Sequence, residues 1–206
     1  MNKEELLIYK VHKILDEVGL LGHHKINTNV IIEILLKDLK SYIQKDPASE
    51  ENYNLIINSY TGFLSLIGYR VANYIINQLK SEFYQIKARE ISEKIKSKTG
   101  IEIHPKAQIG EYFVLDHGFG TVIGETTIIG KNCYILQGVI LGGRSIASNS
   151  KGKRHPTIGN SVEIGAFSRI LGNITIGDNV FIAPHSIITK NIPSNSKILN
   201  FERVVS

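Results

Sequence analysis

Three places in the second half of the sequence combine a histidine with a charged neighbour. These are Glu102 with His104, Asp116 with His117, and Arg154 with His155. A carboxylate that reaches a ring nitrogen orients the imidazole and raises its basicity, so such a histidine can deprotonate a hydroxyl group. A guanidinium offers a fork of N–H donors that matches a carboxylate. These residue types fit general-base chemistry on a hydroxyl, with Arg154 facing a carboxylate and His155 positioning a second substrate group.

Each of these signals has a structural explanation as well. A histidine in a turn is usually a solvated side chain, and an aspartate before it often caps the turn. We expect a structural role for His104, and for the remaining histidines His12, His23, His24 and His185. Asp116–His117 and Arg154–His155 are distinguished by their position, because each lies where a strict sequence repeat is interrupted.

The repeat is an aliphatic residue at every sixth position, often followed by glycine. It comprises Ile103, Ile109, Leu115, Ile123, Ile129, Ile135, Leu141, Ile158, Ile164, Ile170, Ile176, Ile182 and Ile188. Neither an α-helix, with a period of 3.6, nor a simple alternating strand produces this spacing. A hexapeptide period is typical of a parallel β-helix, in which each unit is one short strand and a turn.

Two interruptions break the six-residue spacing. Leu115 and Ile123 are eight residues apart, and Leu141 and Ile158 are seventeen apart. Insertions in a solenoid are extruded on its outside, often on the binding face. The second interruption therefore predicts an extruded loop over residues 142–156, and both interruptions mark candidate functional positions.

The first half of the sequence has helical periodicity instead. We expect a first helix that ends near Gly19, a second after the cap residues 27–29, a third after Ser49, a fourth over 61–79 and a fifth over 81–98. Asp46–Pro47 interrupts this series, and Thr99–Gly100 ends it. The predicted domains are a helical part over 1–99, a β-helix over 100–192 and a C-terminal tail over 193–206.

Composition narrows the functional classes. The 206 residues have a net charge of +5 and contain no lysine- and arginine-rich block with interleaved aromatic residues, so we expect no nucleic-acid partner. No apolar run approaches the roughly 18 residues of a membrane span, and the polar start is unlike a signal peptide. Cys133 is the single cysteine, which excludes a disulfide framework and favours a small buried filler in a cytoplasmic protein.

At this point the sequence resembles a known family, the serine O-acetyltransferases of cysteine biosynthesis. The matching strings are GIEIHP (100–105), LDHG (115–118), VIGET (122–126), QGVILGG (137–143), RHPTI (154–158) and ILGNI (170–174). A lone hexapeptide match would indicate only an acyltransferase-like solenoid, whereas this series is specific to the serine acetyltransferase branch.

The resemblance implies a left-handed β-helix that trimerises through the solenoid, with active sites between neighbouring subunits; a dimer of trimers is left open. It implies that His117 is the general base on the serine hydroxyl, that Glu102 orients His117, and that His155 also belongs to the catalytic group. Serine-binding roles fall on Asp46, Asp116 and Arg154, and acetyl-CoA-binding roles on Gly142, Gly143 and Ala166. No metal is implied.

The chain departs from the family pattern in two places. The residues after Gly143 read Arg-Ser-Ile in a longer loop, and the segment 199–203 lacks the usual Gly-x-Pro-Ala-Arg stretch. Relatives that dock into cysteine synthase carry a tail that ends in isoleucine, whereas this sequence ends in Val204-Val205-Ser206, so we expect no tight complex with that enzyme.

Two alternatives to serine acetylation stay open: acylation of another small hydroxyl or amine, and a non-catalytic assembly subunit. Intact Asp116, His117, Arg154 and His155 argue against the latter.

Overall fold

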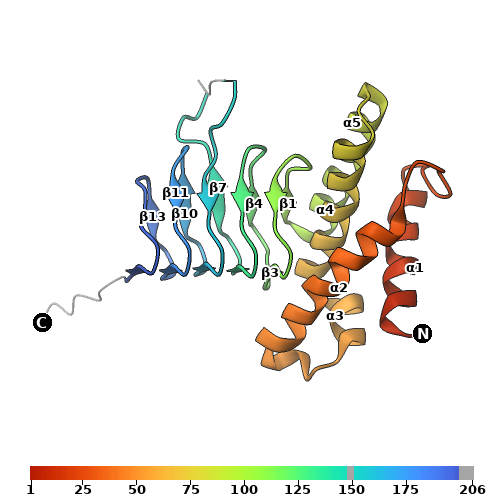
Figure 1. The fold of residues 1–206 in the computed structure, drawn as a ribbon, viewed down its shortest axis with the longest axis horizontal. Helices are drawn as coiled ribbons and strands as arrows, with labels where there is room; N and C mark the ends of the chain where they lie inside the picture. The colour runs from red at the N-terminus through yellow and green to blue at the C-terminus, as the bar shows by residue number, and fades with distance from the viewer. Residues whose placement is uncertain (148–150, 200–206) are drawn as a thin grey trace, which may run out of the picture.

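A computed structural model describes residues 1–147 and 151–199 of the chain. Figure 1 shows a bundle of helices stacked against one end of an elongated solenoid of short strands. The expected fold class, a helical N-terminal part followed by a left-handed parallel β-helix of hexapeptide repeats, is confirmed. The segment 200–206, which contains the tail residues Val204, Val205 and Ser206, lies outside the described residues.

The helices follow the predicted order closely. They are α1 (Lys3–Asp16), α2 (Thr28–Lys45), the 3-10 helix η1 (Pro47–Ser49), α3 (Tyr53–Ser59), α4 (Thr61–Gln78) and α5 (Glu82–Thr99). Asn2 and Glu5 form a capping box at the start of α1, and Asn27 caps α2 as expected. Gly100 ends α5 with a φ of 69°, a left-handed conformation in which glycine carries no steric penalty. None of the described helices is long and apolar enough to cross a membrane.

The strands form three parallel sheets, one on each side of a prism. They are β1 (Glu102–Ile103), β2 (Gln108–Ile109), β3 (Val114–Leu115), β4 (Val122–Ile123), β5 (Ile128–Ile129), β6 (Tyr134–Ile135), β7 (Ile140–Gly142), β8 (Thr157–Ile158), β9 (Glu163–Ile164), β10 (Arg169–Leu171), β11 (Thr175–Ile176), β12 (Phe181–Ile182), β13 (Ile187–Ile188) and β14 (Lys197–Ile198). Sheet A has the order β1-β4-β7-β10-β13, sheet B β11-β8-β5-β2 and sheet C β14-β12-β9-β6-β3.

The repeat residues are the core of the prism, and the interruptions are visible in the strand register. All thirteen repeat residues are buried. A regular coil has eighteen residues, as between Arg169 and its partner Ile187. The first interruption lengthens its coil to twenty residues, because Glu102 pairs with Val122. The second lengthens its coil to twenty-nine, because Ile140 pairs with Arg169. Cys133 is a fully buried filler, and burial raises the pKa of its thiol to about 11.

The β-helical pairing continues beyond residue 192, where the sequence led us to place the start of a tail. Ile192 bridges to Ile176, and Ile198 pairs with Ile182. Both pairs are sixteen residues apart instead of eighteen. The last coil is two residues shorter, so these isoleucines fall off the six-residue spacing and were not recognised as part of the repeat.

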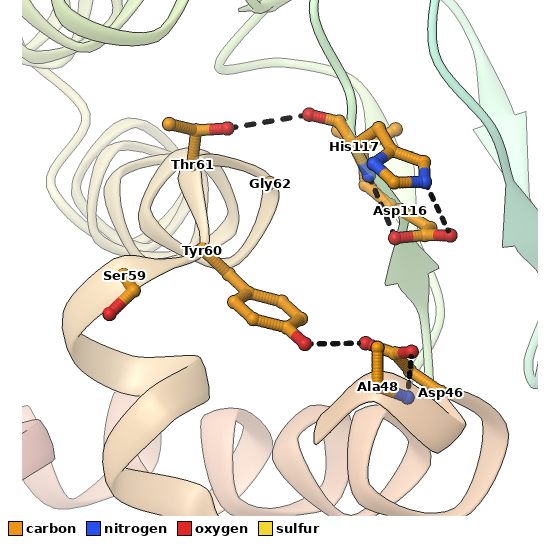
Figure 2. Close-up of a pocket in the computed structure, with 9 residues that line it drawn as sticks. Asp46, Ala48, Ser59, Tyr60, Thr61, Gly62, Asp116 and His117 are labelled. Atoms are coloured by element: carbon orange, nitrogen blue, oxygen red, sulfur yellow. Dashed lines mark hydrogen bonds and ion pairs between the residues drawn. The ribbon is translucent and has the colours of Figure 1, made fainter. Parts of the chain in front are cut away.

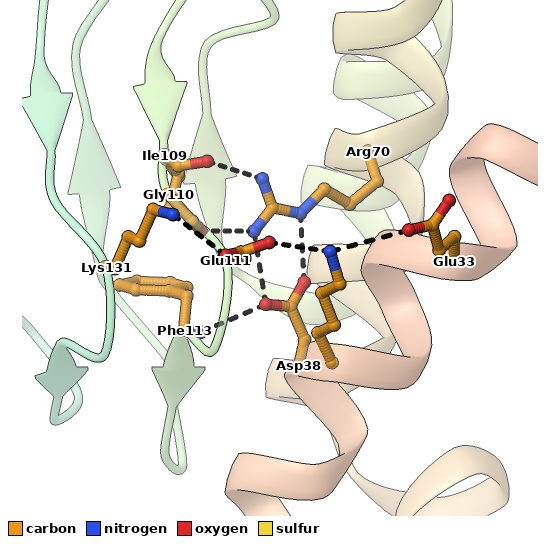
Figure 3. A network of polar contacts seen from close by, with 9 residues as sticks. Glu33, Asp38, Arg70, Ile109, Gly110, Glu111, Phe113 and Lys131 are labelled. Atoms are coloured by element: carbon orange, nitrogen blue, oxygen red, sulfur yellow. Dashed lines mark hydrogen bonds and ion pairs between the residues drawn. The ribbon is translucent and has the colours of Figure 1, made fainter.

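A buried ion pair joins the helical part to the first coil. Arg70 of α4 donates from Nε and Nη2 to the two carboxylate oxygens of Asp38 of α2, at 3.0 and 3.2 Å, and both side chains are almost fully buried. Arg70 also donates to the carbonyls of Ile109 and Gly110, and Asp38 accepts from the Phe113 N–H (Figure 3). Because each buried charge is hydrogen-bonded on several sides, the pair fixes the helices on the solenoid without leaving an unpaired charge.

Candidate active site

A polar pocket of about 410 Å³ lies where the helices meet the first coil. Its lining comes from the end of α2 and η1, from the end of α3 and the start of α4, and from β3 and the chain that follows it. These residues are Asp46, Ala48, Ser59, Tyr60, Thr61, Gly62, Leu115, Asp116 and His117 (Figure 2). Three of the predicted site residues, Asp46, Asp116 and His117, therefore share one pocket although seventy residues separate the first from the others.

A close approach between α4 and β3 shapes this pocket. A methyl group at Gly62 would lie 2.0 Å from the carbonyl oxygen of Leu115, so only glycine permits the contact. Tyr42 of α2 holds the same strand residue, because its hydroxyl donates to the Leu115 carbonyl at 2.7 Å and accepts from the Leu115 N–H at 3.0 Å. The backbone just before Asp116 is thus held by two helices.

Asp46 is held in a defined orientation by its neighbours. One carboxylate oxygen accepts from the Ala48 N–H at 2.9 Å, which caps η1, and the other accepts from the Tyr60 hydroxyl at 2.7 Å. Burial, together with this hydrogen bond to the carboxylate, raises the pKa of Tyr60 to about 12. Tyr60 therefore remains a donor at neutral pH, and Asp46 remains an acceptor facing the pocket.

Asp116 and His117 occupy the first insertion. Asp116 accepts from the His117 N–H at 2.9 Å and from the Tyr134 hydroxyl at 2.8 Å. His117 has a φ of 56°, an uncommon conformation for a residue with a side chain, and its imidazole folds back so that Nε2 lies 3.6 Å from an Asp116 oxygen. The His117 side chain is 71% exposed, so the ring is accessible to a substrate.

Glu102 does not contact His117 as the resemblance led us to expect. Its carboxylate pairs with Lys96 of α5, and within residues 1–147 and 151–199 no hydrogen bond or ion pair joins it to His117. The carboxylate nearest to the ring is that of Asp116. The left-handed backbone at His117 turns the ring toward the preceding side chain, which explains why the sequence neighbour and not Glu102 faces it.

A second polar cluster surrounds Glu125, in the turn that follows β4. Its carboxylate accepts from Arg154 Nη2 and, at 3.0 Å, from Lys106 Nζ. Hydrogen bonds from Arg154, in the first place, and from Lys106 lower the pKa of Glu125 to about 2. The carboxylate is thus ionised at neutral pH and anchors Arg154 at the end of the extruded loop. The guanidinium carries five N–H donors, and this anchor uses only part of the fork.

His155 is packed into the same turn and is 9% exposed. Its ring covers Gly124, where a methyl group would lie 2.2 Å from Nε2. Ring nitrogen Nδ1 accepts from the Thr126 N–H at 3.1 Å and lies 2.9 Å from the Thr126 hydroxyl. Burial lowers the pKa of His155 below its usual range. The three residues of the string Gly124-Glu125-Thr126 therefore seat His155, anchor Arg154 and bind the loop backbone, respectively.

The two clusters lie on opposite edges of sheet A. We call the turns that lead from sheet C into sheet A (116–121, 136–139 and 165–168) the His117 edge. The described residues that lead from sheet A into sheet B (104–107, 124–127, 143–147 and 151–156) are the His155 edge. The loop that carries Arg154 and His155 leaves the solenoid at the top of Figure 1, at the far end of the sheet A strands from β3. Within residues 1–147 and 151–199, the pocket that Asp46, Asp116 and His117 line does not include Arg154 or His155.

The residues predicted to bind acetyl-CoA divide in the same way. Gly142 ends β7 and Gly143 follows it at the His155 edge, whereas Ala166 lies at the His117 edge. At Gly142 a methyl group would lie 3.2 Å from the side chains of Ile140 and Leu171, so a larger residue would crowd these two neighbours. Phe167 follows Ala166 with a φ of 60° and stacks on His185, with ring centroids 5.3 Å apart.

Sequence reasoning missed several contributors to these clusters. Tyr60 carries no local signal, because its hydroxyl reaches Asp46 only through the packing of α4 on α2. Tyr134 could have been found from the coil length, since it pairs with Val114, twenty residues earlier, and so lies beside Asp116. Thr126 and Glu125 belong to a string that we recognised without assigning roles. Among the residues that the structure describes, no group of three or more His, Cys, Asp or Glu side chains is placed to hold a metal ion.

The chain is similar to known hexapeptide-repeat transferases in both sequence and structure. Residues 155–190 match the family described as Bacterial transferase hexapeptide (six repeats). Serine acetyltransferase of Helicobacter pylori is 42% identical over 77% of this chain and 88% of that protein, and the Synechococcus elongatus enzyme is 38% identical over 82% of this chain and 66% of that protein. The crystal structure of Neisseria gonorrhoeae serine acetyltransferase in complex with serine superposes with a TM-score of 0.79 at 30% identity, covering 97% of this chain and 79% of that one.

Proposed function

Because this chain belongs to the serine acetyltransferase family, we propose that it transfers an acetyl group from acetyl-CoA to the hydroxyl of L-serine, which yields O-acetylserine for cysteine biosynthesis. The observation that carries the proposal is the pairing of an exposed histidine with two oriented carboxylates in one pocket, together with an anchored arginine and histidine on the opposite edge of sheet A. These are the groups that a reaction of a small amino acid hydroxyl requires.

His117 is the general base in this proposal. Its exposed imidazole accepts the hydroxyl proton as the serine oxygen attacks the acyl carbon, and Asp116 at 3.6 Å stabilises the imidazolium that forms. The carbon–sulfur bond of the thioester then breaks, and the imidazolium returns the proton to the departing sulfur, so that CoA leaves as the free thiol. Asp46 and Asp116 present oxygens to the same pocket, where they can accept from the serine ammonium group. That Glu102 orients His117 stays part of the proposal, and it requires Glu102 to exchange its present pair with Lys96 for the imidazole.

Arg154 and His155 bind the other end of serine. The guanidinium is held by Glu125, so the free part of its fork is pre-oriented for the serine carboxylate. Preorganisation of this kind reduces the entropy lost when the substrate binds. His155 lies beside it as a second polar contact.

Acetyl-CoA, when bound, supplies a thioester-activated acetyl group. Two of the residues predicted to hold it, Gly142 and Gly143, carry no side chain that could block an extended arm, and Ala166 is followed by an exposed aromatic ring at Phe167. We assign Gly142, Gly143 and Ala166 to the acetyl-CoA site.

We further propose that the protein works as a homotrimer, in which one subunit's His117 edge faces the next subunit's His155 edge. Both the acceptor residues and the donor residues are divided between these edges, so one contact between copies would complete both sites. A cyclic arrangement repeats the same contact at each interface and closes on itself.

Thiol release from acetyl-CoA tests the activity. The acceptors compared would be L-serine, homoserine, threonine, amino sugars and serine amide. We expect L-serine to give the highest kcat/KM and serine amide to bind poorly for want of a carboxylate. Faster turnover of an amino sugar or another acceptor would replace serine as the substrate, and no acyl transfer to any acceptor would overturn the proposal.

Subunit mixing tests the shared site. Chains with His117→Ala and chains with Arg154→Ala, unfolded and refolded together in equal amounts, should regain about one quarter of wild-type activity, because a random cyclic assembly pairs two intact edges at that frequency. Refolding each variant alone is the control. If the mixture is no more active than the separate variants, the two edges do not cooperate across subunits.

A further inference from the structure

The Thr126 hydroxyl has a hydrogen-bond inventory that fixes where its hydrogen points. Its oxygen lies 3.0 Å from the Arg154 backbone nitrogen, 3.1 Å from the His155 backbone nitrogen and 2.9 Å from His155 Nδ1. Backbone N–H groups only donate, so both of them direct a hydrogen at the Thr126 oxygen and occupy its two lone pairs. The hydroxyl hydrogen is therefore left for the third neighbour, Nδ1.

His155 Nδ1 receives a second hydrogen from the same residue. The backbone N–H of Thr126 donates to it at 3.1 Å. A ring nitrogen that accepts hydrogen bonds cannot carry a hydrogen of its own, and a neutral imidazole then carries its single proton on the other nitrogen. In His155 that nitrogen is Nε2.

We propose that Thr126 is a positioning residue that holds His155 as a neutral imidazole with its proton on Nε2, so that His155 serves the acceptor site as a hydrogen-bond donor and not as a base. The role of His155 toward the acceptor rests on the proposed function. The state of the ring does not, because it follows from contacts within this chain alone.

The surroundings of the ring act in the same direction. Burial over Gly124 disfavours the imidazolium, and the positive charges of Arg154 and Lys153 on the loop disfavour it further. Glu125, on the turn beneath, acts in the opposite sense, but its carboxylate is already engaged by Arg154 and Lys106. A proton on Nδ1 would also break both hydrogen bonds from Thr126. Nδ1 would then be a donor itself, and it would face the two Thr126 donors, the backbone N–H and the hydroxyl.

The consequence is a division of roles between the two histidines. His117 is exposed and so can contact the substrate, as a base must. His155 offers a fixed N–H to an oxygen of the acceptor, beside the Arg154 fork. A donor whose protonation does not change across the working range keeps acceptor binding independent of pH on that side of the site.

Nitrogen-15 NMR of the histidine side chains tests the ring state directly, on the full-length protein without substrate. The His155 signals are assigned by their loss in His155→Gln. We expect a hydrogen-bearing Nε2, an unprotonated Nδ1, and a titration below the ordinary histidine value of ~6.5. A wild-type ring with its proton on Nδ1, or one that titrates at or above that value, would overturn the proposal whatever the variants do.

The variants then assign the effect to the hydroxyl. Thr126→Ser keeps the hydroxyl and should keep both the tautomer and the titration, whereas Thr126→Val removes the hydroxyl and should move the titration of His155 upward. If Thr126→Val leaves the titration in place while the protein stays folded by circular dichroism, the hydroxyl is not the positioning group. If Thr126→Val fails to fold, the wild-type spectrum and Thr126→Ser still decide.

Kinetics connects the ring state to the proposed reaction. We expect Thr126→Val to raise the KM for serine roughly tenfold at pH 7, with a smaller change in the KM for acetyl-CoA, as for the loss of one good hydrogen bond of about 1.4 kcal/mol. His155→Gln, which keeps a donor but no basic nitrogen, should retain more activity than His155→Glu, which has no donor. Equal losses in the two variants would contradict a donor role. Absence of serine acetylation by the wild-type protein would remove the proposed function and leave the NMR result standing.

Discussion

The two edges of sheet A present their histidines in opposite ways. His117 is 71% exposed, in a left-handed turn, with one carboxylate beside it, whereas His155 is 9% exposed and is held by several hydrogen bonds over a glycine. A general base has to meet the substrate and change its protonation state, so exposure suits it. A binding group works best when its geometry and charge are set before the substrate arrives. The difference agrees with the proposed division, in which the His117 edge carries the chemistry and the His155 edge the recognition of serine.

The sharpest test of this division is removal of the base. His117→Ala should lower kcat by ~10²–10⁴, the usual contribution of a positioned general base, with little change in stability because the side chain is exposed. Steady-state kinetics and a thermal melt measure the two effects. His24→Ala, which removes an exposed histidine from the helical part, is the matched control. Turnover close to wild type in His117→Ala would remove the base assignment.

A substitution at the His155 edge should change the KM for serine and not kcat. Arg154→Lys keeps the charge but loses the planar fork, so we expect the KM for serine to rise by about 10–100-fold, as for the loss of a charge-assisted hydrogen bond, and the KM for acetyl-CoA to change less. Arg89→Lys on α5, whose guanidinium pairs with Glu93 and does not line the pocket, is the control for a conservative exchange. Equal rises in both KM values would show that Arg154 does not read the serine carboxylate.

The pocket wall at the His117 edge depends on one close approach. Gly62→Ala would place a methyl group 2.0 Å from the Leu115 carbonyl oxygen, so α4 has to move away from β3. We expect a loss of about 1–3 kcal/mol in the free energy of unfolding, as for overpacking, with a raised KM for serine. Denaturant titration measures the stability. Thr61→Ala, the neighbouring position, should be nearly neutral because it loses only one long hydrogen bond to the His117 carbonyl.

The hydrogen bonds of Glu125 to Arg154 and Lys106 should make the stability of the protein depend on pH. The pKa of Glu125 is lowered to about 2, so its stabilising interaction is complete above the ordinary value of ~4.3 and is lost as the pH falls toward 2. Glu125→Gln should therefore be less stable than wild type by about 1 kcal/mol from pH 5 to 8, a figure reduced by solvent screening at this partly exposed site. The difference should disappear near pH 2, and a gap that persists there would show that the effect is not ionic.

The smallest expected effect concerns the orientation of Asp116. Tyr134→Phe removes the 2.8 Å hydrogen bond to its carboxylate, with a net contribution of about 1 kcal/mol, and should raise the KM for serine about fivefold while kcat stays within twofold. Tyr9→Phe on the surface of α1 is the control. A large fall in kcat would instead indicate that Tyr134 takes part in proton transfer, and the pH–rate profile would then shift as well.

Much of the fold was predictable because the six-residue spacing of the aliphatic residues is typical of a parallel β-helix. An aliphatic residue at every sixth position can be buried in only one way, so the strands and both insertions followed from counting. Ile192 and Ile198 escaped because the last coil is two residues shorter, which shifts them off the spacing. The helices were placed well where caps mark their ends, as at Asn27 and Gly100.

The candidate site was predictable only in part. His117, Asp116, Arg154 and His155 were singled out by their position at the insertions, and the roles of the last two depend on neighbours that no local pattern marks. The role predicted for Glu102 stays a prediction: in the structure Glu102 pairs with Lys96, and the backbone at His117 turns the ring toward Asp116. Tyr60 and Thr126 act through contacts between segments, and those contacts appear only when the chain is folded.

The sequence by itself determined that the chain winds into a three-sided solenoid capped by helices, since periodic burial of apolar residues is a property of spacing. It also determined where the solenoid opens to admit functional groups. Only the tertiary structure decided which groups meet: that Asp46 joins His117 across seventy residues, that Thr126 holds His155, and that the two halves of the site lie on opposite edges of one sheet. Hydrogen bonds and ion pairs depend on distances of a few tenths of an ångström, and such distances are set by how separate segments pack, which no spacing along the chain records.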